Sequence, residues 1–448
     1  MPLIQPIRAI RYTPKANGDV SPFIAPPYDV IDQAHKNQLL QTDPHNVVAI
    51  DLPHLPAKTA GPDAVYKQAN VTFRQWLHEG VLVQQHDPAV FVYQQTYTAP
   101  GNGTKPFKRR GLMANVPIQP FGQSIDGHGA IHPHEQTFSG PKEDRMKLMC
   151  ATQAQLSPIF GLYSDQDHRM HDLLKQVVES GRPSFFGHTP NDGVLHEMWT
   201  VDDPNHIARF TQTLSDSDIF IADGHHRYST ALNHRQQLID AGRLDPAQAN
   251  HPANACLFVL VAMQDPGMIV LPTHRVLGGM TGFSIDQMAR AAKGKLQIHP
   301  FAGHDLAALA QALPAAGQHA IGLYDPAQPN QPLAIATTVQ ADPLAQTHGD
   351  RSTAWRQLDV AIAQHLVVEA ICQPNFCPPG QPIDWKFPHS VSELKTQTDQ
   401  DGFQLGLVMQ ATPLESVRQV SEAGELMPQK STFFYPKIAT GLAIHPLA

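Results

Sequence analysis

Hydrophobic and polar residues alternate along this chain with two different periods, which divide it into short segments. Segments with apolar side chains at helical spacing predict amphipathic helices, and these are residues 63–79, 141–154, 204–214 and 226–241. Short apolar runs between turn residues predict buried strands, and these are residues 89–98, 158–163, 218–222 and 255–263. Beyond residue 278 we expect helices at 284–292, 305–313, 357–372 and 414–423, and strands at 320–324, 333–339 and 403–409. The two periods together predict a mixed fold of the α/β or α+β class.

The length of the chain bears on its division into domains. A chain of 448 residues can bury two or three hydrophobic cores rather than one. We expect an N-terminal α/β segment at residues 1–125, a central core at 126–280 and a C-terminal α/β segment at 281–448.

Composition narrows the class of protein. No stretch has the eighteen or more apolar residues of a membrane span, and the first residues do not form a secretory signal, so no membrane partner is expected. The formal net charge of −8 makes nucleic acid an unlikely partner. The cysteines are too scattered for a disulfide framework, which favours a reducing cytoplasm: Cys150, Cys256, Cys372 and Cys377.

The segment I-F-I-A-D-G-H-H-R-Y at residues 219–228 combines a predicted strand end with a predicted helix start. Asp223 can hold Mg²⁺ or orient a histidine, and Gly224 allows a positive φ or a close approach of backbone to ligand. His225 and His226 point in different directions, so at most one of them is expected to be a primary ligand contact, and the other orients it or packs. Arg227 can bind an oxyanion through two parallel N–H groups. The segment predicts a site for phosphate or another compact anion, whereas the alternative is a capped polar turn.

A second motif, I-H-P-H-E-Q-T, lies at residues 131–137. His132 and His134 share a face if the segment is extended, as metal-binding pairs do, although no third ligand is evident. Glu135 can act as a general base or a metal ligand. The motif predicts a catalytic or ligand-contacting role for His134 or Glu135, and a chance pairing of histidines is the alternative.

Three further positions are candidates for anion contacts. Arg145 lies one turn into the helix that follows the second motif, where most charged residues are expected to face solvent. His274 and Arg275 lie at a strand end, where ligands of open α/β sheets bind, or they are a polar strand terminus. Lys430, together with Ser431 and Thr432, is expected to form either a phosphate contact or a plain turn. The nucleotide-binding motifs G-x-x-x-x-G-K-[ST] and G-x-G-x-x-G after a strand are absent from the sequence.

Seven motifs resemble those of a bacterial and archaeal family known as domain of unknown function 1015. The resemblance runs nearly end to end, through A-P-P-Y-D-V-I (25–31), H-E-Q-T (134–137), G-P-K-E-D-R-M (140–146), L-S-P-I-F-G-L-Y (156–163), A-D-G-H-H-R-Y (222–228), P-T-H-R-V-L (272–277) and M-P-Q-K-S-T-F-F-Y-P-K (427–437). The chain is identified as a member of that family.

The D-G-H-H-R element also resembles the nucleotide-phosphate loop of the ParB/sulfiredoxin-like superfamily, which includes free-serine kinases. This resemblance implies a ParB/sulfiredoxin-like central core with flanking α/β segments. It implies that Gly224, His225, His226 and Arg227 surround nucleotide phosphates, and that Glu135 acts as the base.

Three hypotheses about function follow. The first is a phosphoryl-transfer enzyme, a kinase or phosphatase of a serine-like or other small metabolite, with Mg²⁺ and a nucleotide (ATP or ADP) as cofactors. Its partner would be a small phosphorylated metabolite or nucleotide, and its catalytic candidates are Glu135, His134, Asp223 and His226. The second is a non-catalytic nucleotide-binding regulatory protein of ParB-like type. The third, a weaker alternative, is a metal-dependent hydrolase that uses His132, His134 and Glu135, although the residues do not predict a zinc site.

Overall fold

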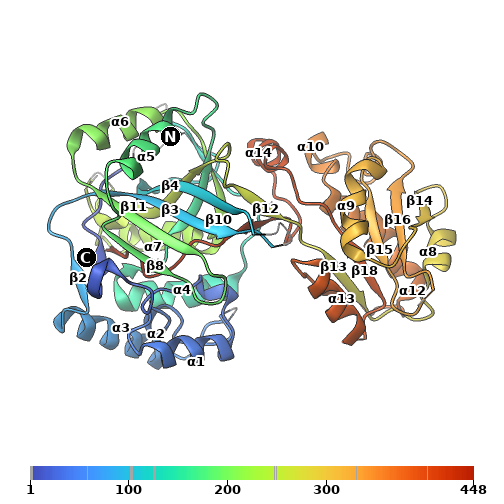
Figure 1. Ribbon diagram of the computed structural model, residues 1–448, viewed down its shortest axis with the longest axis horizontal. Helices are drawn as coiled ribbons and strands as arrows, with labels where there is room; N and C mark the ends of the chain where they lie inside the picture. Colours follow the sequence, from blue (N-terminus) through green and yellow to red (C-terminus); the bar gives the residue numbers. More distant parts are fainter. Residues whose placement is uncertain are drawn as a thin grey trace. The chain divides into compact units, whose positions relative to one another are not determined.

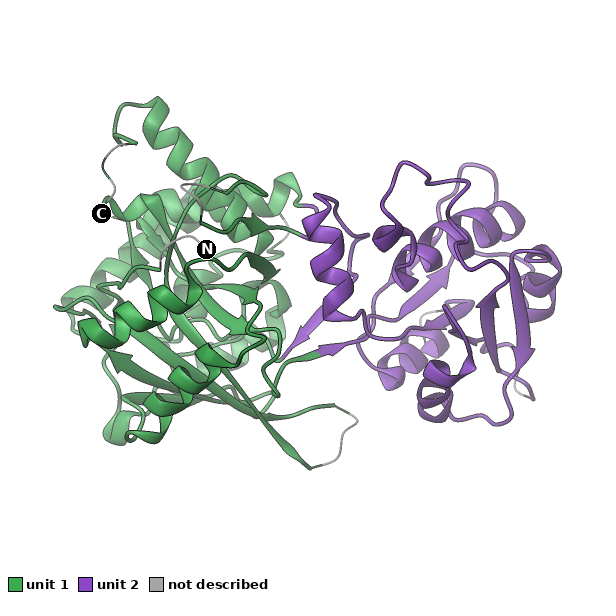
Figure 2. Cartoon of the chain, turned by 90° about the horizontal axis from the view of Figure 1, so that it is seen from above, with its two compact units in different colours: residues 1–133, 137–269, 436–448 green, residues 134–136, 270–435 purple. Residues whose placement is uncertain are grey.

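The computed structural model describes residues 4–57, 59–100, 104–124, 128–246, 248, 250–328, 330–400 and 402–447 (Figure 1). It confirms the mixed α/β class. The chain forms two compact units (Figure 2): the first holds residues 1–133, 137–269 and 436–448, and the second holds residues 134–136 and 270–435. The three-segment division and the ParB/sulfiredoxin-like core stay predictions. No helix in the described ranges is both long enough and apolar enough to span a bilayer.

An eight-stranded sheet forms the centre of the first unit. Its strands lie in the order β5 (Ile131–His132), β10 (Ile219–Asp223), β7 (Ile159–Tyr163), β11 (Ala255–Ala262), β4 (Pro106–Pro117), β3 (Val90–Thr98), β9 (Leu195–Val201) and β8 (Phe185–His188). Two neighbouring pairs are parallel, β10 with β5 and β11 with β7, and the other neighbouring pairs of this sheet are antiparallel. All eight residues of β11 are buried, which explains why its sequence is a continuous apolar run rather than an alternating one.

Helices and the returning end of the chain complete the first unit. Its helices are α1 (Gln33–Thr42), α2 (Val48–Asp51), α3 (Asp63–His78), α4 (Ser139–Thr152), α5 (Arg169–Glu179), α6 (Pro204–Leu214) and α7 (His225–Asp240). Helix α4 contacts both α3 and α7, and α7 contacts strand β7. Two short pairs, β1 (Ile10–Tyr12) with β2 (Leu82–Gln84) and β6 (Ala154–Gln155) with β20 (His445–Pro446), tie the two ends of the chain to this unit.

A six-stranded antiparallel sheet forms the centre of the second unit. Its strand order is β14 (Leu296–Pro300), β16 (Leu333–Thr338), β15 (Ile321–Tyr324), β18 (Leu405–Val408), β13 (Arg275–Gly278) and β17 (Asp384–Lys386). Leu405 and Leu407 pack with the helical segment η4 (Ile362–Cys372), whereas Val408 packs with α9 (Leu306–Ala316) and α13 (Val391–Gln400) on the other face. This two-residue alternation places a hydrophobic core on each side of the sheet.

The remaining elements of the second unit surround this sheet. They are α8 (Ile285–Ala291), α10 (Thr353–Arg356), α11 (Asp359–Ala361), α12 (Gln373–Phe376) and α14 (Leu414–Glu422), and β12 (Ile269–Leu271) pairs with β19 (Phe433–Tyr435).

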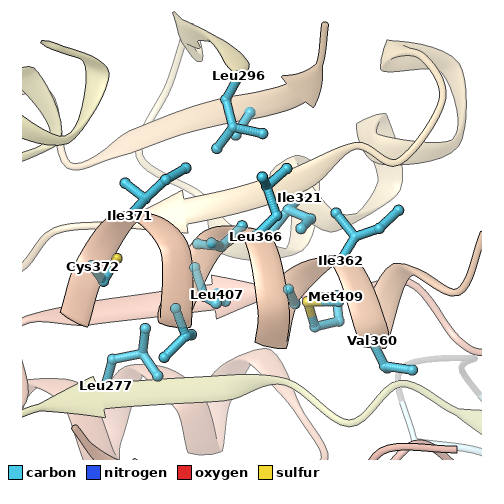
Figure 3. Packing of buried hydrophobic residues seen from close by; sticks show 14 of the residues in the cluster. Leu277, Leu296, Ile321, Val360, Ile362, Leu366, Ile371, Cys372, Leu407 and Met409 are labelled. Atoms are coloured by element: carbon cyan, nitrogen blue, oxygen red, sulfur yellow. The ribbon is translucent and has the colours of Figure 1, made fainter. Parts of the chain in front are cut away.

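The segment η4 is a π-helix, not the α-helix that we expected over residues 357–372. Its residues Ile362, Leu366 and Ile371 belong to the same hydrophobic cluster as the sheet residues Ile321 and Leu407 (Figure 3). Their spacing of four and then five residues fits the wider turn of a π-helix, about 4.4 residues with i→i+5 bonding.

Candidate functional site

The junction of β10 and α7 holds a carboxylate between two cations. Asp223 ends β10, and its two carboxylate oxygens accept hydrogen bonds from Arg227 Nη2 and Lys437 Nζ, each at 2.5 Å. Gly224 follows with φ +97° and serves as the N-cap residue of α7, whose start has no side-chain cap. Only glycine adopts such a φ without strain, which explains the D-G step in the motif. Lys437 was not among the predicted site residues; its motif, residues 427–437, was the only available signal.

Two cations lie beside the Asp223 carboxylate. Burial raises the pKa of Asp223, but the charges of Lys437 and Arg227 outweigh burial and hold that pKa well below its usual range. Asp223 is therefore ionised at neutral pH, and two cations face one carboxylate. Arg227 also donates to the carbonyl oxygen of Pro158. Both cations contact the residue that precedes the N-cap of α7, at the positive end of the helix dipole.

The two adjacent histidines differ in environment. His225 is buried, whereas His226 is half-buried and its Nε2 accepts the backbone N–H of Phe138 at 3.1 Å. That bond joins the start of α7 to the residue before α4. It also requires the proton of a neutral His226 ring to be on Nδ1.

Arg145 lies in a second buried cluster of the first unit. Its guanidinium donates to Asp144 Oδ2 at 2.6 and 2.8 Å and to Asp51 Oδ1 at 3.2 Å, and its Cζ lies 3.9 Å from the ring centroid of Tyr28. The other Asp51 oxygen accepts from the Ser157 hydroxyl at 2.7 Å. The motifs A-P-P-Y-D-V-I, G-P-K-E-D-R-M and L-S-P-I-F-G-L-Y thus meet at one point, a grouping that sequence reasoning missed.

A cavity of about 30 Å³ lies between the Arg145 cluster and Arg227. Asp51, Ser157 and Cys256 also line it. This volume is close to that of a single water molecule, so the space does not admit a nucleotide phosphate.

The other predicted site residues belong to the second unit. His134 is buried; its Nε2 lies 2.9 Å from the Thr432 hydroxyl oxygen, and its carbonyl oxygen accepts from Met427 N. Glu135 is half-buried. The structure therefore brings the H-E-Q-T motif together with residues 427–432, but it places the D-G-H-H-R motif in the first unit.

Three more of the predicted residues cluster in the second unit. His274 is buried and its Nδ1 accepts from Met409 N at 3.0 Å. Burial, and then the charges of Arg275 and His389, lower the pKa of His274 to about 4, so its ring is neutral at pH 7. Arg275 donates to the carbonyl oxygen of Lys430 at 3.1 Å, while the Lys430 side chain is exposed.

Possible metal ligands are dispersed. Within the described ranges, no group of three or more His, Cys, Asp or Glu side chains is arranged to hold a metal ion. His132 Nε2 lies 3.1 Å from Asp218 Oδ2 in the first unit, and His134 belongs to the second.

Known proteins provide structural and sequence comparisons. A free serine kinase in complex with AMP is 13% identical, with a TM-score of 0.32, over 71% of this chain and 92% of that one. A conserved hypothetical protein from Pyrococcus furiosus is 14% identical, with a TM-score of 0.30, over 72% and 95%. SbnI from Staphylococcus aureus, with a C-terminal truncation, is 10% identical, with a TM-score of 0.34, over 75% and 87%.

Comparison of the sequence with known families and curated proteins assigns the chain to a family. No curated protein matches the chain. The family model described as "protein of unknown function (DUF1015)" matches residues 4–361, and the chain therefore belongs to this family.

Proposed function

We propose that this protein is a phosphoryl-transfer enzyme, a kinase or phosphatase of a small hydroxyl metabolite, which binds nucleotide phosphates at the N-terminus of α7. The observation that carries the proposal is the pair of cations there: Lys437 and Arg227 both contact the carboxylate of Asp223. The N-cap of the helix is glycine, and no side chain caps the start of the helix by a hydrogen bond. Helix N-termini with nearby cations bind phosphate groups.

Each residue then has a role that follows from its chemistry. Lys437 and Arg227 would stabilise the negative charge that develops on the transferring phosphoryl group. Mg²⁺ typically takes one or two protein carboxylates together with phosphate oxygens, and Asp223 is a carboxylate at this point that fits such a role. When bound, Mg²⁺ would neutralise charge on the phosphate oxygens. The resemblance to free-serine kinases adds Glu135 as the proposed base for the hydroxyl group.

Nucleotide binding tests the first half of the proposal. The full-length protein is titrated calorimetrically with ADP and ATP, with and without Mg²⁺. Lys437→Gln and His226→Ala are expected to weaken binding at least tenfold. The matched control is Lys395→Gln, which removes a lysine that pairs with Asp399 on the surface of the second unit. If the wild-type protein binds neither nucleotide, or if Lys437→Gln binds as tightly as Lys395→Gln, the phosphate site is wrong.

Turnover tests the second half. The protein is incubated with Mg-ATP or Mg-ADP and a panel of hydroxyl metabolites that includes free serine, and phosphorylated products are followed by ³¹P NMR. Glu135→Gln is expected to abolish turnover while it leaves nucleotide affinity within twofold. Tight nucleotide binding without turnover across the panel would instead support the regulatory, ParB-like class.

A further inference from the structure

Arg275 is a buried arginine that has no carboxylate partner in the part of the chain that the structure describes. Its exposed fraction is 2%, and among the described residues its guanidinium donates only to two backbone carbonyls, those of Thr273 and Lys430. Its Cζ also lies 5.3 Å from the ring centroid of Phe387. Arg145 and Arg227, which are buried nearly as deeply, each pair with aspartate. Burial of a charge costs free energy unless the charge is paired, so we expect an anion to bind the guanidinium of Arg275.

The charge on Arg275 persists at physiological pH. Burial lowers the pKa of Arg275 to about 10, which still leaves the group protonated at pH 7. A guanidinium has five N–H donors, and the two carbonyls account for two of them. The side chain can therefore give further hydrogen bonds to an oxyanion without losing its contacts with the backbone.

Arg275 lines a cavity of about 580 Å³ that lies wholly within the second unit. This volume is in the range of small-molecule sites. Trp385 and Phe387, whose rings are 6.0 Å apart and nearly parallel, supply an aromatic wall. The carboxamides of Gln364 and Gln429 supply polar groups on the rest of the lining.

The cavity wall contains one carboxylate among its described residues, that of Glu369. Its oxygens already accept hydrogen bonds from Gln364 Nε2 at 3.1 Å and pair with His365 Nδ1 at 2.8 Å. Glu369 is thus engaged at the surface of η4 by its own neighbours. It does not pair with Arg275.

We propose that this cavity binds a small molecule in which one oxyanionic group, a carboxylate or a phosphate monoester, is attached to a flat apolar ring. The oxyanion binds Arg275, and the ring packs on Trp385 and Phe387. A guanidinium gives parallel hydrogen bonds to either oxyanion, and an aromatic wall favours a flat partner. The site is distinct from the one at α7 and does not depend on the proposed function.

Calorimetry on the full-length protein tests the proposal with three probes. Indole-3-acetate carries the carboxylate, phenyl phosphate carries the phosphate monoester, and indole-3-acetamide is a neutral analogue of the first. At least one charged probe is expected to bind at millimolar concentration or below, and indole-3-acetate at least tenfold more tightly than its amide if the carboxylate is the preferred group. Comparison of indole-3-acetate with phenyl phosphate identifies the preferred oxyanion. Absence of binding by both charged probes overturns the proposal.

Variants locate the binding. Arg275→Gln is expected to weaken binding of the charged probe at least tenfold, and Trp385→Leu is expected to weaken it several-fold. The control Arg418→Gln removes an arginine of the same unit that pairs with Glu415 and Glu422, and it should bind like the wild type. If Arg275→Gln does not fold, as judged by circular dichroism, Arg275→Lys and Trp385→Leu replace it. Folded variants that keep wild-type affinity overturn the proposal, and so does loss of affinity in Lys437→Gln.

Discussion

Asp144 is a fully buried carboxylate whose hydrogen bonds come from two side chains. Arg145 donates to one oxygen at 2.6 and 2.8 Å, and the Tyr66 hydroxyl donates to the other at 2.6 Å. Tyr66 in turn accepts from Gly61 N at 2.7 Å. Because the carboxylate and the guanidinium share one buried site, removal of the guanidinium leaves the Asp144 carboxylate without its counter-charge, and removal of the carboxylate leaves Arg145 with Asp51 alone.

We therefore expect Asp144→Asn to lower the free energy of unfolding by about 3–5 kcal/mol, since it leaves Arg145 buried with only part of its counter-charge. The control Asp399→Asn breaks an exposed pair with Lys395 and should cost less than about 1 kcal/mol. Urea unfolding followed by far-UV circular dichroism measures both. Equal effects of the two substitutions would show that the buried pair contributes no more than a surface pair.

Gly224 permits a second comparison at the residue scale. A Cβ atom at this position would lie 3.0 Å from Arg227 Nε, in addition to the strain of φ +97°. Gly242, just beyond the end of α7, has φ +65° and no atom within 4 Å of the same added Cβ. The two glycines bracket one helix and differ in whether a side chain would meet the arginine.

Gly224→Ala is expected to destabilise the protein more than Gly242→Ala does. Positive φ alone costs about 1–2 kcal/mol for a residue with a Cβ, and only Gly224→Ala must also displace the guanidinium of Arg227. We expect a difference of about 1 kcal/mol between the two, at the scale of a partly lost hydrogen bond to a charged group. Paired urea titrations test this, and a larger cost for Gly242→Ala would contradict it.

At the scale of elements, the sequence predicts well those segments that bury one face. Helix α6 was expected at 204–214 and is Pro204–Leu214, where Pro204 follows the N-cap Asp203. Helix α1 was missed because Leu39 is its only buried residue, so its sequence carries almost no apolar period. Strand β14, an edge strand, was missed for a similar reason, since Leu296 alone is buried.

In the candidate site, the sequence predicted only those residues that are adjacent in the chain. The residues of D-G-H-H-R are adjacent in sequence and could be recognised together. Lys437 is 214 residues from its partner Asp223, and no local pattern reports such a distant ion pair. The pairing of Arg145 with Asp51 could not be predicted either, because the two residues are 94 positions apart in the sequence.

The π-helix η4 permits a test at the element scale. Pro374 lacks the N–H that an α-helix would direct to Ala370 O, and Lys295 Nζ donates to that carbonyl at 3.2 Å instead. The wide turn places Ile371 fully inside the core, while Glu369 faces outward. We expect Ile371→Ala to cost about 3–4 kcal/mol and Glu369→Ala less than about 0.5 kcal/mol, as measured by chemical unfolding. Similar costs for the two would contradict the π-helical arrangement.

At the scale of the whole molecule, each compact unit contains a histidine that its fold keeps neutral. In the first unit, His445 Nε2 donates to Pro252 O at 2.9 Å, and its Nδ1 lies 3.2 Å from Asn115 Nδ2, which can donate to it. In the second, His274 Nδ1 accepts from Met409 N. Burial lowers the pKa of both rings to about 4. Protonation of either Nδ1 would remove an accepted hydrogen bond.

Both units should therefore lose stability in mild acid. An unfolded histidine has a pKa of about 6.5, so between pH 6.5 and 4 the unfolded chain binds protons that the folded chain does not. Stability is full above pH 6.5 and falls as the pH drops toward 4. Between pH 7 and pH 5 each of the two histidines should contribute a loss of about 2 kcal/mol. Hydrogen exchange with mass spectrometry measures this loss separately for peptides of each unit.

His445→Gln measures how much of the acid response of the first unit comes from this one ring; His196 in the same unit also has a pKa that burial lowers, to about 3. The variant is expected to be less stable than the wild type at pH 7, because glutamine does not reproduce both hydrogen bonds of the imidazole. It should nevertheless lose less stability between pH 7 and pH 5, and only in the first unit, since its site no longer titrates there. His86→Gln, which changes a side chain that is 95% exposed, serves as the control and should follow the wild type. An unchanged pH slope in His445→Gln would mean that other groups carry the acid sensitivity of this unit.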